Sequence, residues 1–118
     1  MQSRLAVRIK ICTNVALKIE KTKYQNITLA CGNEFKTLAF DISNLGLGIY
    51  TNHLLPKDLI IDMVVDGTSF GLEKEITIRG KITYCKSLLG NKYKYKCGVK
   101  FLDPTEKNVK TIAQSANK

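Results

Sequence analysis

The sequence predicts a mainly β protein: a six-stranded antiparallel β-barrel followed by a single C-terminal α-helix. Several segments alternate apolar and polar residues with a period of two, which is typical of strands that bury one face. Short turn signals separate these segments. A barrel is favoured because closure removes the exposed edges that such antiparallel strands would otherwise present.

The first half of the chain carries three predicted strands. Residues 9–20 form the first, because their odd positions are mostly apolar and their even positions mostly polar. Residues 21–33 are polar and end in a turn signal, although residues 27–29 leave room for a short extra strand or turn. The second and third strands are expected at 34–41 and 47–52, joined by a tight turn.

Three further strands are expected before the helix. Residues 58–65 form a nearly continuous apolar run of strand length, and residues 75–84 alternate, with Gly80 in mid-pattern indicating a bulge or a barrel bend. The last strand covers 93–101. Its odd positions share one face, which we expect to be core: Tyr93, Tyr95, Cys97, Val99 and Phe101.

A helix start follows at Asp103-Pro104-Thr105-Glu106, where Asp103 is expected to cap, Pro104 suits the first helical position and Glu106 completes a capping box. Its apolar face would comprise Val109, Ile112, Ala113 and Ala116. We expect one domain of 118 residues, with an N-terminal arm (1–8), the barrel (9–102) and the helix (103–117).

Composition narrows the function classes. No apolar run is long enough for a membrane span and no signal peptide is evident, so we expect a cytoplasmic protein without a membrane partner. The four cysteines form no CxxC pair and His53 has no partner at zinc-finger spacing, so we expect reduced thiols and no metal site. With no P-loop or nucleophile motif either, we expect neither an enzyme nor a cofactor.

The basic residues are more informative than the net charge of +9, which a solvated lysine surface would also produce. Of the nineteen basic residues sixteen are lysine, yet two of the three arginines, Arg4 and Arg8, stand four positions apart. Arginine binds phosphate through a planar fork and stacks on aromatic planes, which lysine does not do. The pair therefore indicates an anionic ligand with planar groups.

The turn from Asp41 to Gly46 supplies complementary groups. The Asp41 carboxylate can accept two parallel hydrogen bonds from the N1–H and amino edge of guanine, and Ser43 offers a hydroxyl nearby. A structural alternative is that Asp41 and Ser43 cap their own turn while Gly46 supplies a positive φ. Taken with the arginine pair, the turn favours a guanine nucleotide with exposed phosphates.

RxxxR at Arg4 to Arg8, followed by DxSxxG at Asp41 to Gly46, resembles the PilZ domain family. The run from Tyr95 to Phe101 and the helix after it are similar to the end of that family's domain, so the resemblance covers nearly the whole chain. It implies a six-stranded split barrel that binds cyclic di-GMP. By this resemblance, the residues that bind the ligand would be Arg4, Arg8, Asp41, Ser43 and Gly46.

The implied mechanism is a ligand-driven ordering of the N-terminal arm, which would change the surface offered to a downstream protein partner. The spacer from Arg8 to Asp41 is longer than usual for the family, and Ser3 stands where many relatives carry another arginine. The number of ligand molecules bound is therefore open, and so is the regulated process. We expect the protein to be a monomer or a weak dimer.

Two alternatives remain. One is an OB-like barrel that binds single-stranded nucleic acid through Tyr93, Tyr95 and the lysines of the last strand. It is disfavoured because the two tyrosines share the apolar face of the strand, whereas the lysines lie on the opposite face. Nucleic acid is therefore not an expected partner. The other is a PilZ-like adaptor that does not bind the nucleotide.

Overall fold

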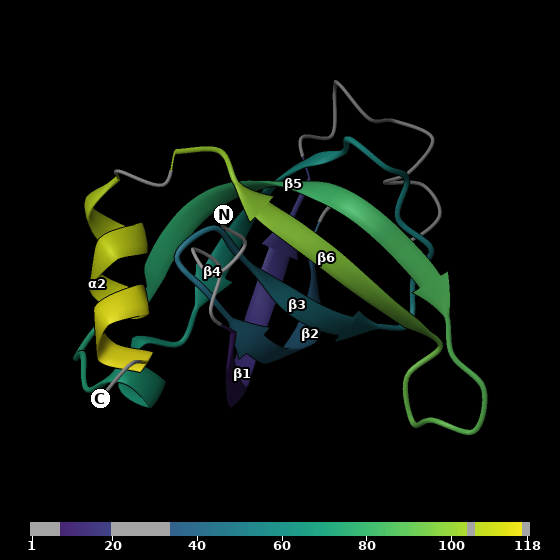
Figure 1. The fold of residues 1–118 in the computed structure, drawn as a ribbon, viewed down its shortest axis with the longest axis horizontal. Coiled ribbons are helices and arrows are strands. Elements are labelled where there is room, and N and C mark those ends of the chain that lie inside the picture. The colour runs from purple at the N-terminus through teal and green to yellow at the C-terminus, as the bar shows by residue number, and fades with distance from the viewer. Residues whose placement is uncertain (1–7, 20–33, 104–105, 117–118) are drawn as a thin grey trace, which may run out of the picture.

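The computed structural model describes residues 8–19, 34–103 and 106–116. Six antiparallel strands close into a barrel in the order β1-β2-β3-β6-β5-β4, and one helix follows (Figure 1). The predicted fold class is confirmed. The elements are β1 (Ile9–Lys18), β2 (Glu34–Ile42), β3 (Gly46–Thr51), β4 (Ile60–Val65), the 3-10 helix η2 (Gly67–Phe70), β5 (Ile76–Ser87), β6 (Tyr95–Phe101) and α2 (Lys107–Ala116).

The barrel interior is a single apolar core to which every strand contributes alternate side chains. Along β1, for example, Val15 and Leu17 are buried while Asn14 and Lys18 are exposed, as the period of two predicted. Thr37 of β2 is also buried, and its hydroxyl donates to the Val15 carbonyl at 2.8 Å. The largest fully buried side chains are Phe101, Leu17, Ile42, Leu47, Ile49, Leu55, Leu59, Ile61, Met63, Ile82, Ile112 and Val15.

Most strands lie within two or three residues of their predicted bounds, but the last one does not include Tyr93. β6 begins at Tyr95, and the prediction that Tyr93 and Tyr95 belong to the core is wrong, because both are only half-buried and neither joins the core cluster. Tyr93 is half-buried in the β5–β6 connection, and its ring stacks on Tyr50 at 5.7 Å between centroids. Tyr50 in turn stacks on Phe40 at 4.4 Å between centroids.

Gly80 marks a close approach of strands rather than a bulge. Its pairing with Ile61 is regular, and the register of β5 against β6 shifts between Ile82 and Tyr84 instead. A Cβ on Gly80 would lie 2.6 Å from Cγ1 of Val99 and 2.8 Å from Cε of Met63. The glycine therefore lets the barrel wall pack tightly at this bend.

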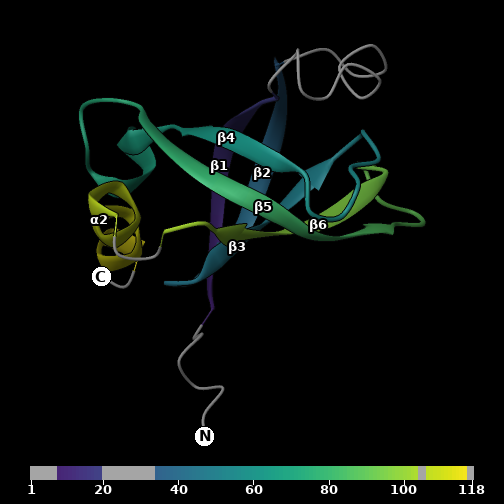
Figure 2. The same cartoon turned by 90° about the horizontal axis from the view of Figure 1, so that it is seen from above.

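The helix begins later than the capping box predicted. α2 starts at Lys107, and the Glu106 carboxylate accepts from the Val109 amide at 3.3 Å, so Glu106 caps the first turn. Residues 104–105 lie outside the described residues. Val109 and Ile112 are buried as predicted, and α2 packs at one end of the barrel against η2 and β5 (Figure 2).

Candidate functional site

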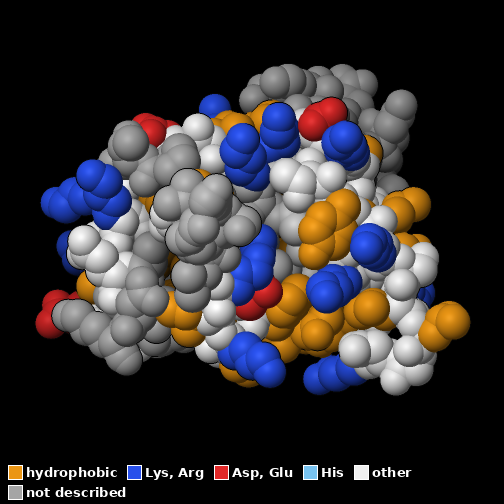
Figure 3. All heavy atoms as spheres, in the orientation of Figure 1, with side chains coloured by type: hydrophobic (Ala, Val, Ile, Leu, Met, Phe, Trp, Pro, Cys, Tyr) orange, Lys and Arg blue, Asp and Glu red, His pale blue; other side chains and the backbone are white. Residues whose placement is uncertain are grey.

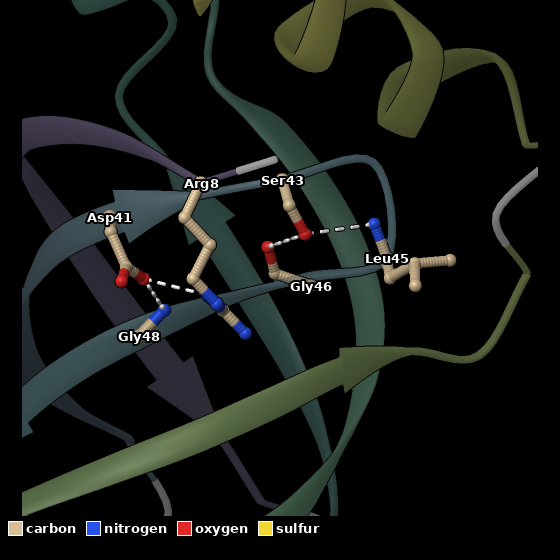
Figure 4. Close-up of polar contacts among 6 residues, drawn as sticks. All are labelled: Arg8, Asp41, Ser43, Leu45, Gly46 and Gly48. Carbon is tan, nitrogen blue, oxygen red and sulfur yellow. Dashed lines mark hydrogen bonds and ion pairs between the residues drawn. The ribbon is translucent and has the colours of Figure 1, made fainter. Parts of the chain in front are cut away.

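The β2–β3 turn is held by Ser43, which is buried with 4% of its surface exposed. Its hydroxyl accepts from the Leu45 amide at 3.1 Å and donates to the Gly46 carbonyl at 3.5 Å (Figure 4). The Ser43 amide also donates to the Gly46 carbonyl at 2.9 Å. In this conformation the Ser43 hydroxyl therefore caps its own turn, as the structural alternative for this residue predicted.

Gly46 is required by packing and not by a left-handed backbone. Its φ is not positive, unlike those of Gly71 and Gly90. A Cβ at Gly46 would lie 2.0 Å from the Val99 carbonyl oxygen, because β3 begins directly against β6 there. The turn is also tied to β6 by the Phe101 amide, which donates to the Leu45 carbonyl at 2.9 Å. The expected positive φ is thus wrong, and Gly46 allows the close approach of two strands.

Asp41 lies at the end of β2 and receives two donors on one oxygen. Arg8 Nη1 donates to Asp41 Oδ1 at 2.8 Å, and the Gly48 amide donates to the same oxygen at 2.9 Å (Figure 4). The Asp41 side chain is 18% exposed and that of Arg8 47% exposed. Among the described residues, both donors to the Asp41 carboxylate contact Oδ1 and none contacts Oδ2.

The pairing of β1 with β2 explains why Arg8 reaches Asp41. Ile9 pairs with Ile42 and Lys10 with Asp41, so Arg8 precedes β1 beside the start of the turn. Arg8 and Asp41 are 33 positions apart in the sequence, yet their side chains are in contact. The structure thus brings Arg8, Asp41, Ser43 and Gly46 to one end of the β2–β3 pair, whereas Arg4 lies outside the described residues.

A model of the PilZ domain family matches residues 2–117, almost the whole chain. The chain belongs to the PilZ family. PilZ domains are receptor and adaptor domains. No curated protein shows a significant sequence match to this chain.

Solved structures support the PilZ fold at low sequence identity. The Bacillus subtilis inhibitor of motility MotI/DgrA superposes with a TM-score of 0.70 at 15% identity, over 99% of this chain and 51% of that one. The PilZ domain of Escherichia coli YcgR, solved with cyclic di-GMP, gives 0.65 at 13% identity over 97% and 88% of the two chains. MrkH, described as a cyclic di-GMP-dependent transcription regulatory factor, gives 0.62 at 14% identity over 92% and 47%. This PilZ chain therefore spans about half the length of MotI and MrkH.

Sequence reasoning missed Gly48, which supplies a backbone donor to Asp41. Gly48 stands two positions after Gly46, and residues two apart on a strand face the same side. This spacing could have indicated that Gly48 lies beside the candidate site. The aromatic ring of Phe40 lies over Gly48, where a Cβ would come within 2.5 Å of the ring. On the outer face beside Asp41, the Gly48 backbone is therefore covered by the ring of Phe40.

The described parts of this PilZ domain contain no group of three or more His, Cys, Asp or Glu side chains placed to hold a metal ion. In the same residues no helix is long and apolar enough to cross a membrane. A surface hollow of about 320 Å³ lies between β5 and α2. Three acidic residues line it, Asp62, Asp103 and Glu106, against one arginine, so it does not suit an anionic ligand.

Proposed function

We propose that this PilZ domain is a cyclic di-GMP receptor whose site is formed by Arg4, Arg8, Asp41, Ser43 and Gly46. The observation that carries the proposal is the contact between Arg8 and Asp41 beside the β2–β3 turn. These two residues are 33 positions apart in the sequence. A cation that suits phosphate and an acceptor that suits a guanine edge thereby lie within one ligand length. The cyclic di-GMP in the YcgR structure supports the ligand class.

Asp41 would act as the guanine acceptor. A guanine edge donates from N1–H and from its amino group, so it needs two parallel acceptors, which the two carboxylate oxygens of Asp41 can supply. Oδ2 would accept the first of these hydrogen bonds. Oδ1 is shared between Arg8 and Gly48. Ligand binding would therefore draw Arg8 away from Asp41 towards a phosphate, where its fork makes charge-assisted hydrogen bonds. Arg4 would approach the same ligand from the N-terminal side.

We further propose that ligand binding orders the arm, residues 1–8, on the barrel, residues 9–102, while the helix, residues 103–117, completes the single domain. The ordered arm would then present a new surface to a downstream protein partner. The output would be motility or biofilm regulation in a bacterial cytoplasm, in line with the role of MotI as an inhibitor of motility.

Calorimetric titration with cyclic di-GMP tests the site. Wild type is expected to bind at micromolar concentration or better, and Arg8→Ala and Asp41→Ala to weaken binding by at least about ten-fold, the size of one charge-assisted contact. Lys110→Ala, an exposed lysine on α2, is the matched control and should leave the affinity unchanged. Binding that survives both site substitutions would refute the assignment.

A further inference from the structure

We propose that the nucleotide site extends beyond the two motifs, across the outer face of β3 and β6 to Tyr84 on β5, with Lys100 as a phosphate contact. This inference rests on the proposed function and names further ligand contacts of the same site. Neither Tyr84 nor Lys100 belongs to RxxxR or DxSxxG. The inference follows from the strand register of the barrel.

One cross-strand row links Asp41 to Tyr84. Asp41 pairs with Gly48, Gly48 with Gly98, and Gly98 with Tyr84, so these four residues lie side by side across β2, β3, β6 and β5. Neighbouring strands stand about 4.8 Å apart, so the row spans roughly 14 Å. That distance suits a ligand with two purine bases, one at Asp41 and the other at Tyr84.

Both middle members of this row are glycine, and the rings of Phe40 and Tyr84 lie over them. Tyr84 lies against Gly98, where a Cβ would come within 2.4 Å of the tyrosine ring. Tyr84 nevertheless keeps 37% of its residue surface exposed. An exposed aromatic ring that is supported from below by backbone offers a planar surface on which a base can stack.

The adjacent row supplies the cation. Gly46 pairs with Lys100, and Lys100 pairs with Lys81, so an exposed lysine stands directly beside the candidate turn. Lys81 is within 3.8 Å of Asp58, whereas no acidic side chain among the described residues forms an ion pair with Lys100. Opposed like charges destabilise an antiparallel pair, so an anion bound next to Lys100 would relieve a repulsion built into the sheet.

A second lysine pair borders Tyr84 on its other side. Lys96 of β6 lies opposite Lys86 of β5, and Lys86 Nζ is 5.5 Å from the centre of the Tyr84 ring. The glycine row is thus flanked by two lysine pairs, and Figure 3 shows this face with basic side chains around apolar ones and few acidic side chains. A dianionic ligand with planar bases matches this arrangement.

The chain contains no tryptophan, so Tyr84→Trp introduces a single fluorescent reporter at the proposed stacking position. We expect its emission to change on titration with cyclic di-GMP, with half-saturation at the dissociation constant found by calorimetry. Tyr93→Trp is the matched control: Tyr93 stacks on Tyr50 away from the glycine row, and its emission should stay constant.

Affinity provides the second measurement. Tyr84→Leu keeps an apolar cover over Gly98 but removes the ring, and we expect it to weaken binding about ten-fold. Lys100→Ala should weaken binding about five-fold and reduce its salt dependence, while Lys110→Ala should not. Thermal unfolding of each variant confirms that it is folded.

Different results would contradict the proposed function and the extended site. If wild type does not bind cyclic di-GMP, the proposed function is wrong, and this inference falls with it. If wild type binds and Asp41→Ala weakens binding, but Tyr84→Trp is silent and both Tyr84→Leu and Lys100→Ala bind as wild type does, only the extended site is wrong.

Discussion

Cys85 and Cys97 form a directly opposed pair on β5 and β6, and their environments differ. Cys97 is fully buried, whereas Cys85 is only partly so and accepts from the Leu55 amide at 3.5 Å. Burial raises the pKa of the Cys97 thiol far above its usual value, and a hydrogen bond with Cys85 acts in the same direction. Cys97 should therefore stay a neutral thiol that fills the core, as the sequence predicted for reduced structural cysteines.

This difference predicts an order of thiol reactivity in the native protein. At pH 8.5, iodoacetamide should modify the exposed Cys12 rapidly and leave Cys97 unmodified, because the thiolate is the nucleophile and burial prevents its formation. Peptide mass mapping after timed labelling measures both sites in one sample. Adding urea should abolish the difference; equal rates in the native protein would contradict the assigned burial.

At the scale of elements, the candidate turn depends on how closely β3 approaches β6. Gly46 faces the Val99 carbonyl, and Gly48 faces the ring of Phe40, so these two glycines shape the face as much as the polar side chains do. The DxSxxG pattern is therefore partly a packing requirement. Its serine and glycine hold the turn that positions Asp41.

Gly46→Ala should consequently destabilise the fold before any question of ligand contact arises. A Cβ 2.0 Å from a backbone oxygen forces β3 and β6 apart, and overpacking of this kind costs about 1–3 kcal/mol. Urea unfolding measures the loss. Asn44→Ala, at the exposed tip of the same turn, is the control and should change stability by less than about 0.5 kcal/mol. Equal stability of the two variants would show that the strands can separate freely at this point.

At the scale of the whole molecule, α2 covers one end of the barrel through Val109 and Ile112, which join the same core as the strands. Helix and barrel should therefore unfold together, as a single cooperative unit. The helix is thus part of the domain's stability, although it contributes no residue to the candidate site.

Ile112→Ala tests this coupling. Ile112 is fully buried, so its truncation should cost about 2–4 kcal/mol and lower the midpoint for the entire protein in one transition. Circular dichroism, followed in parallel with tyrosine fluorescence, checks that both signals shift together. Separate transitions for the helix and the barrel would contradict a shared core.

Ligand binding should also stabilise the whole molecule. At a cyclic di-GMP concentration one hundred times the dissociation constant, the native state gains about 2.7 kcal/mol, which raises the melting temperature. Asp41→Ala, which should bind about ten-fold more weakly, should gain at most about 1.4 kcal/mol at the same concentration, and guanosine triphosphate should not produce the shift in wild type. A shift in Asp41→Ala as large as that of wild type would place the ligand elsewhere on the barrel.

The sequence alone determined the strand-rich fold class, the terminal helix and the motif positions, because periodicity and turn chemistry are local properties. It also predicted that Arg8 and Asp41 act together, and the observed ion pair places them in contact, although their role towards a ligand stays a prediction. Tyr93 was misplaced because alternation continues past the point where β6 stops pairing.

Only the tertiary structure decided which residues of distant strands share a row. The sequence holds no direct record that Gly46 meets Lys100 or that Asp41, Gly48, Gly98 and Tyr84 lie side by side. Such neighbours depend on strand order and on a register shift between Ile82 and Tyr84. Both are set when the closed barrel packs one common core, so the outer face on which we place the extended site is a consequence of the inner one.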